Sequence, residues 1–418
     1  MNAESQFASA KQPMLSRISW LPVVAMGAMS LISYLDRTTL AILAPTILRD
    51  THLSSEQYGW IVSAFSVAYM VGNLFWGYLI DHFGLRASVT VAVLLWTIAS
   101  ASHASVTTFL GFAVARIVLG FGEGATFPGG LRTVHETLPE ESRGTGISIA
   151  YAGASAGAII TPLIVTPIAL RFGWRAAFIC TGVIGVAWLL WWSIVARHLG
   201  AGRARRIADE GGERRPSQVF DSRILAFVSL YAFGALPLAF GTYAAPLYLS
   251  KALGLSQALI GKLVWLPPLG WEVGYVVAGQ LFDRRLKTVH GISSIWIQLV
   301  ALSFLLLGLP LAFTSRAPSL SWALLMITLP MITTGGLVIV ALRYGTLMFP
   351  GRPGLVAGVG AASWSGVVAL VMPLIGRYFD QHQYSSAFQL VAAFPMVGFI
   401  GWRLLGFRTQ TQTIGSIR

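Results

Sequence analysis

Residues 175–196 read RAAFICTGVIGVAWLLWWSIVA, a run of 22 residues that carries a single charge, at its first position. A helix of about 20 apolar residues crosses the roughly 30 Å hydrocarbon layer of a bilayer. A strand that crosses a membrane shows instead about ten residues of alternating polarity, and this run does not alternate. The stretch therefore predicts a helix that spans a membrane.

The composition extends this prediction to the whole chain. Hydrophobic residues make up 55% of its 418 residues and charged residues only 11%, whereas a soluble domain carries about 25% charged residues. So few charges cannot cover a globular surface, and the outer surface must therefore face lipid. We predict an all-α membrane protein with twelve spans, at residues 20–44, 57–80, 86–103, 108–132, 144–170, 175–196, 224–250, 258–282, 290–314, 320–347, 353–379 and 385–407.

The distribution of basic residues predicts the orientation of these spans. The net charge is +13, but most Lys and Arg residues fall on one side of the membrane when the spans are counted from the N-terminus. Cytoplasmic segments carry such an excess of positive charge, so both termini are predicted to be cytoplasmic. The densest basic stretch, 197–223, is interpreted as a loop against anionic lipid. We expect membrane lipids as partners, and no nucleic acid.

The chain repeats itself once. Residues 77–86 read GYLIDHFGLR and residues 279–285 read GQLFDRR, so that the form G-x-x-x-D followed by basic residues recurs after 202 positions. Residues 171–178 read RFGWRAAF and residues 379–388 read FDQHQYSSAF, and their closing Ala-Phe pairs are 210 positions apart. Two offsets that agree this closely indicate an internal duplication.

The duplication predicts two six-helix bundles. We place them at residues 20–196 and 224–407, joined by the basic linker 197–223, with cytoplasmic tails at 1–19 and 408–418. Two such halves that rock about a central midplane site give alternating access in secondary transporters built from repeats.

Ionisable residues within the spans are candidates for function, because a charge at the centre of a bilayer costs several kcal/mol unless it is paired or hydrated. Arg116 and Glu123 are seven residues apart and share one helix face, while Asp36 and Arg37 are adjacent. We hypothesise that the two helices pair crosswise, acid to base, and that protonation of a carboxylate frees an arginine for an anion. A static ion-pair network is the alternative. The six residues at depth are Asp36, Arg37, Arg116, Glu123, Glu272 and Arg343.

The last two charges and several aromatic residues have two interpretations each. Glu272 is either a coupling or hydroxyl-binding acid, or a neutral, hydrogen-bonded carboxylic acid. Arg343 lies near the cytoplasmic end of its span, where snorkelling to the interface is expected. Four aromatic residues either line the cavity or pack within the bundle; they are Trp265, Trp271, Tyr275 and Trp364.

Four segments carry a resemblance to a known family. The motif at 77–86 resembles the signature loop of the major facilitator superfamily. Within that superfamily, YLDRTTLAILAP at 34–45, ARIVLGFGEGATFP at 115–128 and GWRAAF at 173–178 resemble the anion:cation symporter family. That family includes bacterial hexuronate and galactonate transporters and the vesicular glutamate transporters. The resemblance implies the twelve-helix major facilitator fold, a monomer, and a bacterial inner membrane as its location.

The resemblance also implies roles for individual residues. Positions that match Asp36 and Glu123 are proton-coupling acids, with Glu272 as a third candidate, and the position of Arg37 holds the substrate carboxylate. No cofactor is implied beyond the proton as coupling ion. The expected substrate-binding set is Arg37, Tyr69, Arg116, Trp271, Tyr275, Trp364 and Ser365, and the expected cytoplasmic gate is Asp81, Arg86, Asp283 and Arg284.

The sequence departs from the family at two positions. Sugar-acid symporters often carry an asparagine two turns before the proline of the eleventh helix; here that region holds Trp364, Ser365 and Gly366. The arginine that glutamate transporters carry on the seventh helix has no counterpart, because residues 224–250 contain no charge. The first departure argues against recognition of sugar hydroxyls at this position. The second leaves Arg37 as the arginine expected on the substrate path, which favours a monocarboxylate over a dicarboxylate.

The expected function is a proton-coupled symporter that imports a small organic anion, either a sugar acid or another monocarboxylate. A lipid exporter of the Spinster type is an alternative because it similarly pairs Y-x-D-R with G-x-G-E. A receptor that has a transporter fold and binds an organic acid without turnover is another. The sequence lacks both the G-x-x-x-x-G-K-[S/T] and the H-E-x-x-H motif, so we expect neither an ATP-driven pump nor a metal-dependent enzyme.

Overall fold

The computed structural model describes residues 3–199, 222–288, 294–349 and 353–406, and within this part of the chain it is built almost entirely of helices. Eleven of the described helical segments are long and apolar enough to cross a membrane. Most of the predicted linker and the predicted C-terminal tail lie outside the described residues, as do the side chains of residues 1–19.

The first half of the chain forms seven helices. These are α1 (Ala3–Thr51), α2 (Ser55–Phe83), α3 (Leu85–Ser102), α4 (Phe109–Glu123), α5 (Thr126–Thr137), α6 (Arg143–Phe172) and α7 (Trp174–Val195). Helices α4 and α5 form one span that is interrupted directly after Glu123. The other five correspond to the predicted spans within a few residues, except that α1 begins before the membrane segment.

The second half is less regular. Its elements are α9 (Ser222–Val228), a π-helical turn (Ser229–Phe233), α10 (Leu236–Ala239), a second π-helical turn (Phe240–Ala244), α11 (Ala245–Lys251), α12 (Gln257–Leu263), α13 (Leu266–Thr288), α14 (Ser294–Gly308), a 3-10 helix (Leu309–Arg316), α15 (Leu320–Met348), α16 (Pro353–Asp380) and α17 (Tyr384–Gly406). The predicted span 224–250 is thus a chain of short helices, which its uniform apolar sequence did not indicate.

One predicted span is not among the eleven. Residues 258–282 are divided between α12 and α13, and the chain leaves the helix between Leu263 and Leu266. Two adjacent prolines, Pro267 and Pro268, follow the break. Proline lacks the backbone N–H that a helix interior requires, so it is accommodated only at the first turn. The polar residue Glu272 and the basic end of α13 lower the hydropathy of this segment.

Glycine at a positive φ angle makes two of the tight connections. Gly84 (φ 86°) joins α2 to α3 and Gly173 (φ 85°) joins α6 to α7. A residue with a Cβ atom is strained in this conformation. Both glycines belong to motifs noted above, so the motifs GYLIDHFGLR and GWRAAF partly encode these turns.

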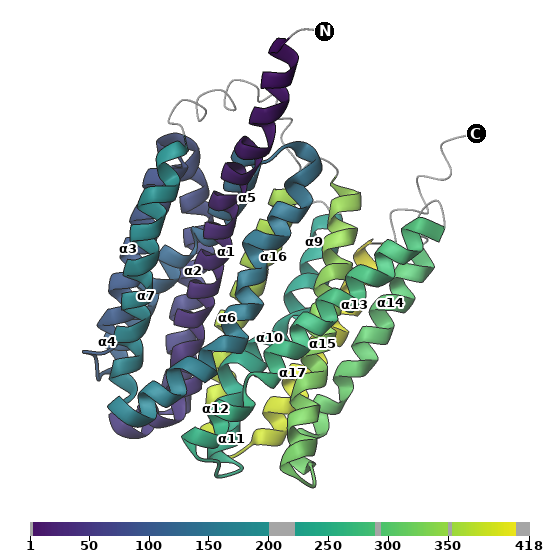
Figure 1. Ribbon diagram of the computed structural model, residues 1–418. Coiled ribbons are helices and arrows are strands. Elements are labelled where there is room, and N and C mark those ends of the chain that lie inside the picture. The colour runs from purple at the N-terminus through teal and green to yellow at the C-terminus, as the bar shows by residue number, and fades with distance from the viewer. Residues whose placement is uncertain (1–2, 200–221, 289–293, 350–352, 407–418) are drawn as a thin grey trace.

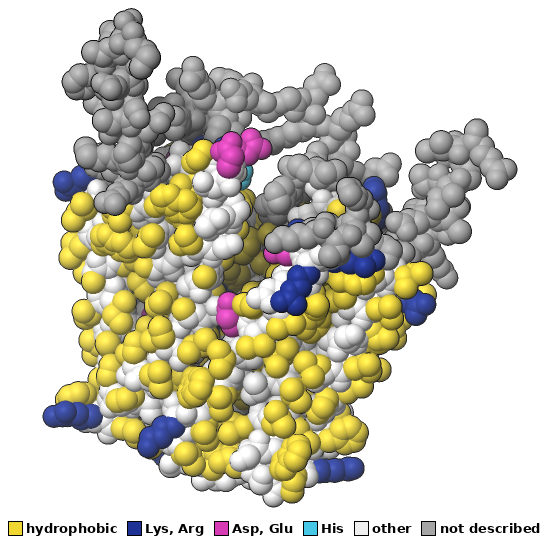
Figure 2. All heavy atoms as spheres, turned by 45° about the vertical axis from the view of Figure 1, so that its right-hand side comes forward, with side chains coloured by type: hydrophobic (Ala, Val, Ile, Leu, Met, Phe, Trp, Pro, Cys, Tyr) yellow, Lys and Arg dark blue, Asp and Glu magenta, His cyan; other side chains and the backbone are white. Residues whose placement is uncertain are grey.

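The helices form two groups that stand side by side (Figure 1). In the first, α1 packs against α6, α2 against α4 and α3 against α7; in the second, α15 packs against both α13 and α14. Helix α1 begins, and α17 ends, at the same end of the bundle, which we call the terminal end. Large apolar side chains cover much of the outer face (Figure 2), as a lipid-facing surface requires.

The two groups meet most closely at the end opposite the termini. There α2 packs along α16, and an added Cβ at Gly59 would overlap the carbonyl oxygen of Met372. Ser63 Oγ donates to the carbonyl oxygen of Ala369 at 2.6 Å across the same interface. Towards the terminal end, the surface between the groups is hollowed (Figure 2).

Candidate substrate and proton site

A cavity of about 130 Å³ lies between the two helix groups. Helices α1, α2, α5 and α6 form one wall, while the first π-helical turn and α10, α13, α15 and α16 supply residues to the other. Its lining residues are Ser30, Ser33, Tyr34, Arg37, Tyr69, Thr126, Phe127, Tyr151, Ala154, Tyr231, Ala235, Leu238, Trp271, Tyr275, Val338, Ala361 and Trp364. Arg37 is the one charged side chain in this lining.

Arg37 forms a buried ion pair with Glu123. Its Nη2 atom lies 2.9 Å from Glu123 Oε2 and its Nε atom 3.3 Å from the same oxygen. Ser33 Oγ donates a third hydrogen bond to this oxygen at 2.8 Å. The second oxygen, Glu123 Oε1, is buried without a hydrogen-bond partner. The carboxylate therefore holds the arginine through one oxygen and retains unused acceptor capacity.

Three aromatic rings surround the guanidinium of Arg37. Its Cζ atom lies 4.7 Å from the ring centroid of Tyr34, 4.8 Å from that of Phe65 and 4.6 Å from that of Tyr69. Cations within about 6 Å of an aromatic ring are attracted by its quadrupole. The rings thus hold the charged group in place even when its carboxylate partner leaves.

Asp36 and Arg116 do not form the second crosswise pair of the hypothesis. Asp36 Oδ1 accepts a hydrogen bond from Ser100 Oγ at 2.6 Å, and that hydroxyl lies 2.7 Å from Thr181 Oγ1. Asp36 Oδ2 and the Nε and Nη2 atoms of Arg116 are buried without hydrogen-bond partners. The hydroxyl of Ser100, which itself contacts the hydroxyl of Thr181, therefore solvates Asp36 in place of Arg116.

Arg116 instead lines a second, much smaller cavity of about 10 Å³, together with Arg37, Tyr58 and Tyr243. It reaches this position because glycines on the same helix let α4 approach its neighbours. An added Cβ at Gly120 would overlap the carbonyl oxygen of Phe65 on α2. Small residues at such positions allow the backbones of two helices to approach closely.

Comparison with known proteins identifies the family. The Major Facilitator Superfamily matches residues 26–370 of the chain. The chain belongs to the Major Facilitator Superfamily. It is therefore an integral membrane transporter and not an enzyme, as the sequence predicted.

The curated relatives of this major facilitator include sugar-acid transporters. It is 27% identical to the galacturonate transporter of Dickeya chrysanthemi, over 65% of this chain and 84% of that protein. It is also 27% identical to the hexuronate transporter of Escherichia coli K12, over 63% of this chain and 65% of that protein. A probable sulfoacetate transporter of Cupriavidus necator is 27% identical over 89% of this chain and 90% of that protein.

Solved structures of other major facilitators share the fold. A bacterial homologue of the lysosomal transporter Spinster, in an inward-facing and occupied conformation, gives a TM-score of 0.70 at 14% identity, over 92% of this chain and 96% of that chain. A peptide transporter in complex with sulfate gives 0.72 at 16% identity, over 93% of this chain and 94% of that chain. At these identities the likeness shows the fold alone, so it does not favour the lipid-exporter alternative.

The aromatic candidates of this facilitator divide between lining and other positions: Trp265 is not among the lining residues, and its indole N–H donates to the carbonyl oxygen of Lys262 at 2.9 Å. Tyr69, Trp271, Tyr275 and Trp364 line the cavity. Ser365 does not: it is 1% exposed, and its hydroxyl donates to the carbonyl oxygen of Ala361 within α16. Ser365 lies one position, about 100° of helix rotation, from Trp364, so its side chain points away from this cavity. A substrate-binding role for Ser365 stays a prediction that the geometry does not strengthen.

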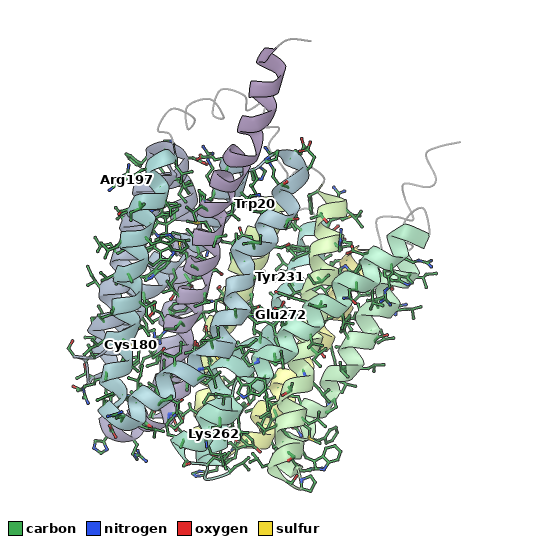
Figure 3. The ribbon with its side chains drawn as sticks, viewed as in Figure 1. Trp20, Cys180, Arg197, Tyr231, Lys262 and Glu272 are labelled. Atoms are coloured by element: carbon green, nitrogen blue, oxygen red, sulfur yellow. The ribbon has the colours of Figure 1, made fainter. Side chains whose placement is uncertain are left out.

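Glu272 is half-buried on α13, which packs against α6, and it does not belong to the cavity lining (Figure 3). Its neighbour Trp271 faces the cavity instead. A role for Glu272 in coupling stays a prediction, which the geometry does not strengthen.

The predicted gate residues lie near the terminal end and pair within their own half. Arg132 Nη1 lies 3.2 Å from Asp81 Oδ1, and Arg343 Nη2 lies 3.4 Å from Asp283 Oδ1. These carboxylates are 65% exposed in both pairs, so each contact is a surface ion pair. Arg343 thus reaches the interface, as expected for snorkelling. Arg86 is exposed at the start of α3, and the gate role of these residues and of Arg284 stays a prediction.

The opposite end holds a cluster that the sequence did not reveal. Asp380, at the end of α16, accepts hydrogen bonds from the backbone N–H groups of Ser55 (2.9 Å) and Glu56 (2.8 Å) at the start of α2. Lys251, at the end of α11, lies 3.1 Å from Asp380 and also donates to the Ser55 hydroxyl. We call these residues the Asp380 latch, because they tie the first half of the chain to the second.

The sequence also missed cavity residues. Ser33 was not singled out although it holds Glu123, and three lining tyrosines, Tyr34, Tyr151 and Tyr231, were not predicted. Helical spacing carries a signal for Ser33 and Tyr34, because they precede Arg37 by four and three residues and so share its helix face. Nothing in the apolar sequence around Tyr151 or Tyr231 indicates which face meets the cavity.

Proposed function

We propose that this protein is a proton-coupled symporter that imports a small organic anion by alternating access. The observation that carries the proposal is the buried pair between Arg37 and Glu123 on the wall of the central cavity. A guanidinium is the side chain best suited to bind a carboxylate through two parallel hydrogen bonds. Here its present partner is itself a carboxylate that can be neutralised by one proton.

The pair allows Arg37 to exchange the carboxylate of Glu123 for that of a substrate. When Glu123 is protonated, it no longer neutralises Arg37, and a buried unpaired charge is costly, by about 3–5 kcal/mol where one partner of such a pair is removed. An anion that enters the cavity relieves this cost by taking the place of the carboxylate. When the anion leaves, Glu123 releases its proton and restores the pair. Proton and anion are thereby bound together and released together.

Asp36 and Arg116 extend this exchange. Arg116 has two N–H groups without partners, so it is proposed to stabilise the deprotonated acids of the cluster while Arg37 holds the substrate. Asp36 is solvated by the hydroxyls of Ser100 and Thr181, and we propose it as a second proton-binding acid. Its unpartnered oxygen, Oδ2, is where a proton would be accommodated.

The proposed direction of transport and the proposed membrane rest on the distribution of basic residues and on the sources of the related proteins. The positive-inside distribution supports cytoplasmic termini, and the bacterial sources of the relatives support a bacterial inner membrane. The terminal end is then the cytoplasmic side, and the hollow towards it is the path of release. We propose a monomer as the working unit, since the cavity is built from one chain.

Uptake into proteoliposomes tests the proposal. An inward pH gradient should drive accumulation of galacturonate or of another organic anion, and a protonophore should abolish it. Liposomes without protein serve as the control for leak of the anion. Gradient-independent uptake of a neutral sugar, or proton-insensitive export of a lipid, would overturn the proposed function.

A further inference from the structure

The proposed function leaves the body of the anion undefined, and the cavity wall defines it further. We propose that the site selects an aromatic monocarboxylate over a polyhydroxylated sugar acid. This inference rests on the proposed function, because it takes Arg37 as the group that binds the carboxylate. It concerns the remaining wall, which determines what that carboxylate is attached to.

The lining is rich in aromatic rings, and its uncharged polar groups are the hydroxyls of serine, threonine and tyrosine and the indole N–H groups of tryptophan. Among its residues there is no Asp, Glu, Asn, Gln, Lys or His, and Arg37 is its single charge. Sites that bind a polyhydroxylated ring need donors and acceptors placed at each hydroxyl, because an unpaired buried hydroxyl loses its hydrogen bonds to water. The aromatic residues of the lining are Tyr34, Tyr69, Phe127, Tyr151, Tyr231, Trp271, Tyr275 and Trp364.

Several polar atoms of the lining are already engaged within the protein. Ser33 donates to Glu123, Tyr151 donates its hydroxyl to the carbonyl oxygen of Phe127 at 2.8 Å, and Trp364 donates its indole N–H to the carbonyl oxygen of Ala235 at 2.9 Å. With its N–H occupied, Trp364 offers the cavity an apolar ring.

The rings are arranged to receive another ring. Tyr34 on α1 and Trp271 on α13 lie 5.7 Å apart by ring centroids, and Trp271 meets Tyr275 edge to face at 5.4 Å. Aromatic pairs favour separations of about 4.5–7 Å in offset or edge-to-face arrangements. Tyr34 also contacts the guanidinium of Arg37. A ring held among these side chains would therefore direct its carboxylate at Arg37.

The size of the cavity agrees with a single ring. Its volume is about 130 Å³, and an apolar cavity of about 150 Å³ is known to accept benzene. The wall also spans both halves of the chain, with Tyr34 and Tyr69 from the first and Trp271 and Trp364 from the second. An aromatic anion would thus contact both halves at once, which is what a substrate that couples their movement must do.

Binding to the purified full-length protein tests the inference with four probes. Benzoate, cyclohexanecarboxylate and galacturonate share a carboxylate, and benzamide is the neutral counterpart of benzoate. We expect benzoate to bind at least tenfold more tightly than galacturonate and about fivefold more tightly than cyclohexanecarboxylate, with no binding of benzamide. Dissociation constants are measured by calorimetry, which avoids the passive leak of protonated benzoate through liposomes.

Two variants locate the effect. Trp364→Leu should weaken the binding of benzoate about fivefold and that of galacturonate by a smaller factor. Trp322→Leu is the matched control, because Trp322 lies on α15 and is 51% exposed on the outer face. Arg37→Ala should weaken the binding of benzoate and galacturonate alike, by about tenfold to a hundredfold.

The outcomes separate the inference from the function on which it rests. Galacturonate that binds as tightly as benzoate, or more tightly, overturns the aromatic preference and leaves an organic-anion symporter. An equal loss of both ligands in Trp364→Leu overturns it as well. Should neither benzoate nor galacturonate bind, and no organic anion be taken up under a pH gradient, then the proposed function and the inference both fail.

Discussion

The two halves of the molecule differ in what they bring to the cavity. Among the described residues, the four fully buried charges, Asp36, Arg37, Arg116 and Glu123, all belong to the first half. The second half contributes Tyr231, Trp271, Tyr275 and Trp364, all uncharged, and its own charges at depth are half-buried (Glu272) or exposed (Arg343). The first half therefore supplies the buried charged residues, and the second half supplies uncharged residues that shape the cavity.

Backbone regularity follows the same division. The first half is built from long helices, whereas the seventh span contains two π-helical turns, Ser229–Phe233 and Phe240–Ala244. Such turns widen the helix by one residue and are frequent at functional sites. Tyr231 and Tyr243 lie within them, and they line the large and the small cavity respectively. The second half thus uses backbone irregularity where the first uses charge.

The largest expected effect comes from removing the charge that faces the cavity. Arg37→Ala should weaken anion binding by about 1.5–3 kcal/mol, roughly tenfold to a hundredfold, because a charge-assisted hydrogen bond is lost. Arg37→Lys should recover part of the affinity, since an ammonium lacks the planar fork. Calorimetry on folded protein measures both. Wild-type affinity in Arg37→Ala would mean that the second half alone binds the substrate.

Amide variants of the two acids should separate coupling from binding within the first half. Glu123→Gln keeps the shape of the side chain but can no longer bind and release a proton. Accumulation of substrate under a pH gradient should therefore fall to the level of empty liposomes. Exchange of substrate at equal pH should persist, because Asp36 and Arg37 remain. Asp36→Asn should also lose accumulation. Uptake and counterflow are measured in parallel, and if both variants accumulate substrate normally, Glu272 becomes the first residue to test.

A glycine variant should shift the balance between closed and open arrangements. In Gly59→Ala the new methyl group would overlap the carbonyl oxygen of Met372, which forces α2 and α16 apart. Overpacking costs about 1–3 kcal/mol, so the closed state at this end should lose at least several-fold in population. Spin labels across the interface, in a chain whose single cysteine, Cys180, is replaced, measure the separation.

The same interface supplies the control for this measurement. Gly366→Ala adds a methyl group on α16 that would lie 3.9 Å from Met70 Sδ, an ordinary contact. The distribution of distances between the spin labels in this variant should match that of the parent protein. A matching distribution in Gly59→Ala as well would show that close packing of α2 on α16 does not determine which end is closed.

The smallest effect is expected at the Asp380 latch. Lys251→Met removes the ion pair with Asp380 but leaves both carboxylate oxygens to accept from the backbone N–H groups of Ser55 and Glu56. Because the side chains of Lys251 and Asp380 are 36% and 29% exposed, the pair contributes at most about 1 kcal/mol. We expect a less than fivefold shift towards opening at this end. Asp283→Asn, at the terminal end, is the matched control and should leave this distance unchanged.

The fold could be predicted from sequence because hydropathy reports the membrane directly. Runs such as 175–196 admit no structure but a helix when every backbone group must be satisfied within the segment. The breaks could not be placed in this way, since an apolar residue fits an α-helix and a π-helical turn equally well. The division of 258–282 was readable in part, from Pro267 and Pro268.

The site could be predicted only where charge marks it. Asp36, Arg37, Arg116 and Glu123 stood out because charges are rare in a span, and the structure gathers them near one another. The partners could not be assigned, because pairing depends on helix rotation: Glu123 pairs with Arg37, while Asp36 bonds to Ser100. The contacts of Asp380 with Ser55 and Glu56 join residues more than 300 positions apart, a separation that no local pattern encodes.

The Asp380 latch itself is sensitive to the electrolyte on one face only. Lys251 and Asp380 lie partly exposed at the end opposite the termini, and mobile ions screen exposed charges over about 8 Å at physiological ionic strength and about 3 Å at 1 M. Salt added on that face weakens the contact, while salt on the terminal face does not reach it. The rate of opening at that end should therefore rise with the ionic strength of the medium it faces, whatever the ionic strength on the other side.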